Sequence, residues 1–341
     1  MTHRFPVKEI AAQSGLSTAT VDRVLNGRAH VSPQTRARVA AALTELEGQE
    51  AQLAARGRRV FVDVVVEAPT RFSREIRLAA EAVLPQLGGA VLRPRFTFHE
   101  RLTGDQTAAI LDRIGGRGTQ GVCLKARDLP QIRQAVARLA ARGIPVVTLF
   151  TDLPDTERLA YVGLDNAMAG RTAAWLIGRM AGDRPGTILT TMSDRSFTGE
   201  EARFAAFSAE IARTAPQLEI RDASGGGGLN PETAKRFSEV AAGAGELAAV
   251  YSMGGGNRAI VAVLSQLVLA PRVYVAHDLD ADNRALLTRG AISVVLDHDL
   301  KADLRQAFAH VLRHLRLWPE GQPMGASDIR IITPANLPDA G

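Results

Sequence analysis

The segment from Phe5 to Leu46 places the strongest constraint on the fold, because helix starts and helix ends recur in it at short, regular spacing. Ser14-Gly15 ends a first helix, and Ser17 is a good N-cap for a second. Asn26-Gly27 ends the second helix, and Ser32-Pro33 begins a third. Two helices joined by a tight turn of about four residues containing Gly form a helix-turn-helix unit, whose second helix enters the DNA major groove.

The same segment resembles the DNA-binding region of the lactose-repressor (LacI/GalR) family of transcriptional regulators. The alternative is an unrelated small helical bundle. The resemblance rests on the runs Thr20-Val21-x-Arg23-Val24-x-Asn26 and Val31-Ser32-x-x-Thr35 and on the wider set of matching positions: Ala11, Gly15, Ser17, Thr20, Val21, Arg23, Val24, Asn26, Val31, Ser32, Thr35, Val39 and Leu46.

This resemblance implies which side chains meet DNA. Thr18 and Ala19 open the second helix and are expected to read base edges in the major groove. Arg23 lies one turn further on and can reach a guanine or a phosphate. The alternatives are that Thr18 is a second capping hydroxyl and that Arg23 lies on a solvated face. Other polar positions are expected to contact phosphates or to cap helices: Ser17, Thr20, Asn26, His30, Ser32 and Thr35.

Residues 48–59 form a connection to the rest of the chain. Relatives carry here a short hinge helix that folds on specific DNA and inserts a leucine into the minor groove. By resemblance, Ala51-Gln52-Leu53-Ala54 matches that helix and Leu53 is the inserted residue. The sequence lacks the tyrosine-x-proline that relatives place before the hinge, and its linker is shorter. The alternative is a flexible linker in which Leu53 packs on its neighbours.

The distribution of charge agrees with a DNA-binding N-terminus. Residues 1–59 contain nine Arg or Lys and five Asp or Glu, a net charge of +4, whereas the whole chain carries +5. The positive charge is therefore concentrated on the small N-terminal segment, where phosphate contacts would need it.

The totals exclude several classes of protein. The 341 residues suit two or three domains, and no run of 18 apolar residues is present to span a membrane. The N-terminus lacks the apolar core of a signal peptide, so we expect a cytoplasmic protein. The single Cys123 excludes a disulfide framework and a Cys-rich zinc site.

From Val60 onward, short apolar strands alternate with amphipathic helices, which is typical of parallel sheets covered by helices on both faces. The predicted strands are residues 60–66, 90–98, 121–125, 144–150, 186–192, 247–253, 272–277 and 291–296. The predicted helices are residues 76–87, 106–114, 129–142, 167–180, 199–214, 231–243, 258–267, 282–290 and 302–315. The strands fall into two successive sets, which indicates two similar lobes rather than one sheet.

The resemblance extends to this part, because two such lobes match the type I periplasmic-binding-protein-like effector domain of the family. The expected fold class is thus α plus α/β: a helix-turn-helix domain followed by two doubly wound parallel-sheet lobes. The expected domains are residues 1–47 (DNA-binding), 48–59 (hinge) and 60–341 (effector binding and dimerisation). Lobe one is expected at 60–163 and 294–322, and lobe two at 164–293 and 323–341.

Ligands of open parallel sheets bind beyond the carboxyl ends of the strands, and many polar residues of this sequence fall there. Phe72 can stack on the apolar face of a sugar ring. By resemblance, Asp165 accepts hydrogen bonds from ligand hydroxyls, and Arg203 binds the ligand through its forked guanidinium group. Acidic, amide, guanidinium and imidazole groups suit a polyhydroxylated effector, a sugar, sugar acid or polyol. The candidates are Arg71, Phe72, Asp152, Asp165, Arg203, Asn257, Asp278 and His298. Alternatively, Asp165 and Asp278 only cap helices, and Arg203 is a solvated charge.

The sequence gives no reason to expect a cofactor or a metal. Asp297-His298-Asp299 follows a strand, where consecutive side chains point to opposite faces and cannot easily meet one ion. The Gly-rich runs are not phosphate loops. We therefore expect a non-enzymatic regulator, a repressor, that binds a pseudo-palindromic double-stranded DNA operator as a homodimer under control of a small effector. The alternatives are a solute-binding protein, which the N-terminal segment contradicts, and a sugar-acting enzyme.

Overall fold

The structure is a computed structural model that describes residues 5–28, 31–55, 58–87, 90–318 and 327–338, without the side chains of residues 48–55. The chain divides into two units. The N-terminal unit comprises Met1–Val60, Gln86–Arg93 and Leu312–Gln322. The large unit comprises Phe61–Pro85, Pro94–Val311 and Pro323–Gly341.

Three helices make up the N-terminal head: α1 (Val7–Ser14), α2 (Thr18–Leu25) and α3 (Pro33–Ala55). Gly15 ends α1 in the left-handed conformation, at φ 62°. The helices enclose a small core in which Ile10, Val21 and Val39 are at most 1% exposed. The three predicted helices are confirmed, but α3 continues through residues 48–55, which the sequence analysis assigns to the linker.

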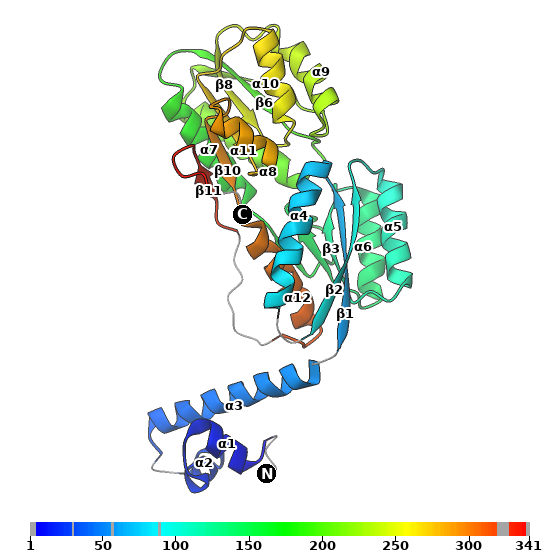
Figure 1. Cartoon of the computed structure of the whole chain (residues 1–341), viewed down its shortest axis with the longest axis vertical. Helices are drawn as coiled ribbons and strands as arrows, with labels where there is room; N and C mark the ends of the chain where they lie inside the picture. The colour runs from blue at the N-terminus through cyan, green and yellow to red at the C-terminus, as the bar shows by residue number, and fades with distance from the viewer. Residues whose placement is uncertain (1–4, 29–30, 56–57, 88–89, 319–326, 339–341) are drawn as a thin grey trace. The chain divides into compact units, whose positions relative to one another are not determined.

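The first sheet of the large unit has the strand order β2-β1-β3-β4-β5. Helices α5 and α6 lie side by side on one face of it (Figure 1), and their apolar side chains pack against β1, β3 and β4. A side chain at Gly121 of β3 would collide with Val311, so α12 packs closely on this sheet. The elements are β1 (Arg59–Glu67), α4 (Thr70–Val83), β2 (Val91–His99), α5 (Gly104–Gly116), β3 (Gly121–Lys125), α6 (Pro130–Ala141), β4 (Val146–Leu149) and β5 (Ala160–Val162).

The second sheet has the order β11-β10-β9-β8-β6-β7, with β11 antiparallel to β10 and the other neighbouring pairs parallel. Its strands β7, β6, β8 and β9 repeat the order of β2, β1, β3 and β4 in the first sheet. The elements are α7 (Asn166–Met180), β6 (Gly186–Thr191), α8 (Thr198–Thr214), β7 (Leu218–Asp222), α9 (Asn230–Ala241), β8 (Leu247–Ser252), α10 (Asn257–Gln266), β9 (Val273–His277), α11 (Ala281–Thr288), β10 (Val294–Asp297), α12 (Leu300–His314) and β11 (Arg330–Ile332).

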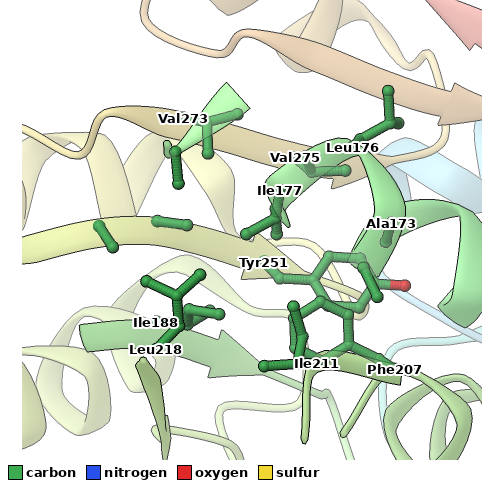
Figure 2. Close-up of a cluster of buried hydrophobic side chains, with 14 of the residues drawn as sticks. Ala173, Leu176, Ile177, Ile188, Phe207, Ile211, Leu218, Tyr251, Val273 and Val275 are labelled. Atoms are coloured by element: carbon green, nitrogen blue, oxygen red, sulfur yellow. The ribbon is translucent and has the colours of Figure 1, made fainter. Parts of the chain in front are cut away.

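Helices α7 and α8 cover one face of the second sheet, and α9, α10 and α11 cover the other. Figure 2 shows the core on the α7–α8 side, where Phe207 and Tyr251 lie together with ring centroids 4.6 Å apart. Gly170 of α7 lets these two helices approach, because a β-carbon there would lie 2.2 Å from the carbonyl oxygen of Arg203. This close contact fixes the position of α8 and hence of Arg203.

The two doubly wound parallel-sheet lobes are thus as predicted, with one correction to their limits. The sequence analysis assigns residues 294–322 to lobe one, but β10 pairs with β9 in the second sheet. The assignment is wrong for 294–297, because the apolar strand completes the second sheet before the chain returns to the first. The chain therefore passes between the sheets three times: after β5, after β10 and between α12 and β11.

The eight predicted strands are all present, with ends that shift by a few residues, and so are the nine predicted helices of the lobes. The short strands β5, β7 and β11 were not located from the sequence. Among the described residues, no helix combines the length and apolarity that a membrane span requires.

Candidate functional site

The exposed start of α2 is the first candidate site. Ser17 caps the helix by accepting a hydrogen bond from the Thr20 backbone N–H at 3.2 Å, and the two hydroxyls lie 2.8 Å apart. Thr18 and Ala19 follow the cap and are exposed, as is Arg23 one turn later. No described residue bonds the side chains of these three, so they are free to meet a DNA groove.

The other predicted DNA-contacting residues have structural partners. Asn26 donates to the backbone and side-chain oxygens of Asp22 at 3.0 and 2.8 Å. Ser32 accepts from the Thr35 backbone N–H at 3.1 Å and so begins α3. These residues cap helices, and their exposed faces remain open to phosphate contact. His30 and the Leu53 side chain lie outside the described part of the chain.

The second candidate site is an inner cavity of about 70 Å³ at the carboxyl ends of strands from both sheets. Its lining includes residues at or just after the ends of β1 and β3, where the strand order of the first sheet reverses, and of β6 and β8, where that of the second sheet reverses. Such switch points are the expected binding sites of open α/β sheets. Of the eight predicted effector residues, five line this cavity: Arg71, Phe72, Arg203, Asp278 and His298.

Arg203 reaches the cavity from α8 and is 6% exposed. Its Nε donates to Asn166 at 2.6 Å and one terminal nitrogen donates to the Met253 carbonyl at 3.3 Å. No described residue accepts a hydrogen bond from the other terminal nitrogen. A buried guanidinium held at two points, with donors to spare, is suited to bond vicinal hydroxyls of a ligand.

His298 stands between two carboxylates. Its Nδ1 lies 2.5 Å from Asp303, and its Nε2 lies 3.4 Å from Asp278. Burial alone would lower the pKa of His298, but the hydrogen bonds to Asp278 and Asp303 outweigh it and raise the pKa to about 10. Burial would likewise raise the pKa of Asp278, yet His298 holds it at about 2. The pair is therefore an ionised donor and acceptor set at neutral pH.

Aromatic side chains form the apolar wall of the cavity. The ring of Phe150 contacts Phe72 edge-on at 5.5 Å and His298 at 5.4 Å. Both Phe150 and Asp278 adopt left-handed backbone conformations, at φ 62° and 65°. Non-glycine residues in this region cost free energy and persist where the surrounding structure enforces them, which is common at functional sites.

Arg71 bridges the two lobes at the cavity. Its Nε lies 3.0 Å from Asp280, and a terminal nitrogen donates to the Gly228 carbonyl at 2.9 Å. Burial raises the pKa of Asp280 to about 6 despite the nearby guanidinium. These contacts join α4 of the first lobe to two loops of the second.

Three predicted effector residues do not line the cavity. Asp152 is bonded by Arg158 and Thr148. Asp165 is exposed and caps α7 by accepting from the Met168 N–H at 2.8 Å. Asn257 is buried and donates to Asn283 at 2.7 Å, while its oxygen accepts from Tyr274. We correct the prediction here, because local capping and packing bonds use these side chains.

Several polar residues of the cavity were missed from the sequence, among them Lys125, Glu200 and Asp280. Burial lowers the pKa of Lys125 and raises that of Glu200. The Lys125 ammonium donates to the Glu67 carbonyl at 3.0 Å and lies 4.1 Å from the Phe197 ring centroid. Lys125 is the last residue of a predicted strand, so its position could have identified it.

The Asp297-His298-Asp299 run does not act as one cluster. Asp297 accepts from the Leu279 N–H, while Asp299 begins α12 and pairs with Arg330 at 2.6 Å. Among the described residues, no group of three or more His, Cys, Asp or Glu could hold a metal ion.

Comparison with known families connects the two sites. The family described as bacterial regulatory proteins, lacI family, matches residues 7–47. The family described as periplasmic binding protein domain matches residues 67–316, most of the chain. The chain belongs to the lacI family of transcriptional regulators. The head of this regulator is thus its DNA-binding domain, and the lobes form its periplasmic-binding-protein-like domain.

Solved structures resemble the lobes of the regulator. They include a glucose-galactose binding protein, GanP, from Geobacillus stearothermophilus (16% identity, 82% of this chain and 99% of that chain, TM-score 0.72). They also include a candidate LacI transcriptional regulator from Bacteroides fragilis (15% identity, 82% of this chain and 98% of that chain, TM-score 0.72). A third is a solute-binding protein from Actinobacillus succinogenes 130z with bound D-allose (13% identity, 81% of this chain and 98% of that chain, TM-score 0.70). A search of curated protein sequences found no match.

Proposed function

We propose that this regulator is a repressor whose affinity for its operator is controlled by a neutral or acidic sugar or a polyol in the inner cavity. The observation that carries the proposal is the arrangement of Arg203, Asp278 and His298 against Phe72 and Phe150 in one cavity. Charged donors and acceptors beside an aromatic wall are what a polyhydroxylated ring requires.

The effector would act by linkage. Residues from both lobes line the cavity, so a ligand there binds the closed form of the lobes better than an open form. An effector changes operator affinity only through its different affinities for the two states, typically by ~1–3 kcal/mol.

The DNA-bound form is proposed to be a homodimer. One helix-turn-helix contacts too few phosphates for tight binding, and two copies on a pseudo-palindrome supply both affinity and half-site spacing. In each head, Thr18, Ala19 and Arg23 would face the major groove, and Leu53 of the hinge segment would enter the minor groove.

The test is selection of bound fragments from genomic DNA, followed by gel shifts of the selected site with and without a panel of sugars and polyols. The expected result is salt-sensitive binding to a pseudo-palindrome that one sugar alters by tenfold or more. Binding with no preference over random duplex would contradict the DNA-binding part. Site-specific binding that no sugar or polyol alters would contradict the effector part.

A further inference from the structure

A second chamber adjoins the inner cavity. This outer chamber has a volume of about 360 Å³ and lies, like the inner cavity, between the first and second lobes. The two spaces share the wall residues Glu67, Glu100, Ser193, Phe197 and Gly227. The two spaces are therefore immediate neighbours that share one wall.

The sizes of the two spaces indicate how much of a ligand each can hold. The inner cavity measures about 70 Å³. Because one water needs ~10–15 Å³ on this scale, that volume holds roughly six water-sized groups, at most one small sugar ring. The outer chamber is several times larger and has room for at least one more ring.

The outer chamber offers hydrogen-bonding groups that the fold holds in place. Gln106 and Thr103 form the capping box at the start of α5, with the Gln106 side-chain oxygen 2.8 Å from the Thr103 N–H. This bond fixes the amide, and no described residue accepts from its nitrogen. On the opposite lobe, Asp194 accepts from the Ser196 N–H through one oxygen and is 42% exposed. Fixed donors and acceptors on both sides suit a hydroxylated ligand.

The charges of the outer chamber favour a neutral occupant over a phosphate. Arg127 is already engaged by Glu67 at 3.1 Å and by Asp194 at 3.7 Å. The chamber's other cation, Arg101, donates to the Gly226 carbonyl and lies near the Glu100 carboxylate. The carboxylates that line the chamber therefore outnumber its arginines, three to two, so an added anion would be repelled.

We propose that the outer chamber binds a second sugar unit, so that the effector is a disaccharide or similar glycoside with one unit in each space. This inference rests on the proposed function, because it extends the same effector site. It assigns Gln106 and Asp194 to selection between one-ring and two-ring ligands, and Arg203, Asp278 and His298 to the inner ring.

Calorimetric titration of the full-length protein tests the proposal. The probes are D-glucose, D-galactose and D-mannose, and the disaccharides maltose, cellobiose, lactose, melibiose and mannobiose. Gln106→Glu keeps the capping oxygen and removes the amide donors, and Asp194→Asn removes one charge. Matched controls are Gln134→Glu and Asp183→Asn, because both residues are exposed and line neither space.

We expect one disaccharide to bind at least tenfold tighter than either of its component sugars. Gln106→Glu and Asp194→Asn should remove most of that gain and leave monosaccharide affinity within about twofold, while the controls change neither. A monosaccharide that binds as tightly as every disaccharide containing it would overturn this inference and leave the proposed function intact. No binding by any saccharide would overturn this inference, and the proposed function would then hold only for a sugar acid or a polyol.

Discussion

Arg203 combines a full charge with nearly complete burial, which proteins accept only where the charge has partners. Its protein partners are an amide oxygen and a backbone carbonyl rather than a carboxylate at bonding distance. The remaining donor capacity is therefore available to a ligand, while the contact at Gly170 keeps the backbone of α8 in place.

Arg203→Ala is expected to weaken effector binding by ~1.5–3 kcal/mol, about 10- to 150-fold, because hydrogen bonds from a charged group are lost. Operator binding without effector should be nearly unchanged. Titration calorimetry and gel shifts measure the two effects. Arg213→Ala, on the same helix but 71% exposed, is the control and should change neither. Equal loss of both activities in Arg203→Ala would argue against a ligand role.

Arg23 is exposed on the recognition helix and has no described side-chain partner. If it bonds a base, Arg23→Ala should reduce operator affinity by ~1–3 kcal/mol and relax specificity at one base pair. Gel shifts against operator variants at each position measure this. A loss of the same size on every sequence would instead identify a phosphate contact.

The raised pKa of His298 predicts how the stability of the folded protein depends on pH. Its pKa is about 10 in the folded protein, above the ordinary 6.5, so the protonated form stabilises the fold. That contribution is complete below about pH 6.5 and is lost as the pH rises toward 10. The melting temperature should fall over this range, and His298→Gln should make the fall shallower. Identical slopes in both proteins would show that His298 does not carry this dependence.

Among the elements, those with strong periodicity and recognisable ends could be predicted from the sequence. The head helices have caps at Ser17 and Ser32, and the lobe strands are apolar runs of sufficient length. The strands β5 and β11 have three residues each, and β7 is a half-exposed edge strand, so none has a clear pattern. The continuation of α3 was missed because residues 48–59 were assigned, by resemblance, to a separate hinge segment.

The effector residues were predicted where a strand end alone decides the position, as for Asp278. Asp152 and Asp165 also lie near strand ends, but local bonds to Arg158 and to the α7 N-terminus turn them away from the cavity. Lys125 ends a predicted strand and could have been included on that ground, whereas Glu200 was missed because its place in the cavity depends on how the two lobes meet, which local sequence does not encode.

The capping residue of α2 offers a test at the level of an element. Ser17→Ala removes the oxygen that bonds the Thr20 N–H and should cost ~1 kcal/mol of head stability. Ser17→Asp keeps a capping oxygen, so it should preserve stability yet weaken DNA binding through its charge. Circular dichroism melts and gel shifts separate the two effects. Unchanged stability in Ser17→Ala would rule out the capping contribution.

At the scale of the whole molecule, closure of the lobes is linked to Asp280. Burial raises its pKa to about 6, whereas an open form would expose it and return the pKa toward 3.8. Asp280 has its higher pKa in the closed form, so as the pH falls the closed form binds the proton first. Lowering the pH through about 6 should therefore favour closure.

Fluorescence energy transfer between dyes on Gln134→Cys and Asp183→Cys, one in each lobe, measures this closure. The transfer efficiency should rise, which reports a shorter distance between the dyes, as the pH is lowered from 7 to 5. Asp280→Asn should remove this pH dependence and favour the closed form at both pH values. The buried Cys123 should stay unlabelled. A shift toward longer distance as the pH falls would contradict the linkage.

The threefold passage of the chain between the sheets has a practical consequence for protein engineering. Helix α12 packs on the first sheet, although the strands before and after it, β10 and β11, belong to the second. A single cut in the chain therefore cannot separate the two lobes, because each fragment would keep an element that belongs to the other lobe. Building a hybrid sensor from this chain would require transplanting discontinuous fragments together, and limited proteolysis should release no autonomous half.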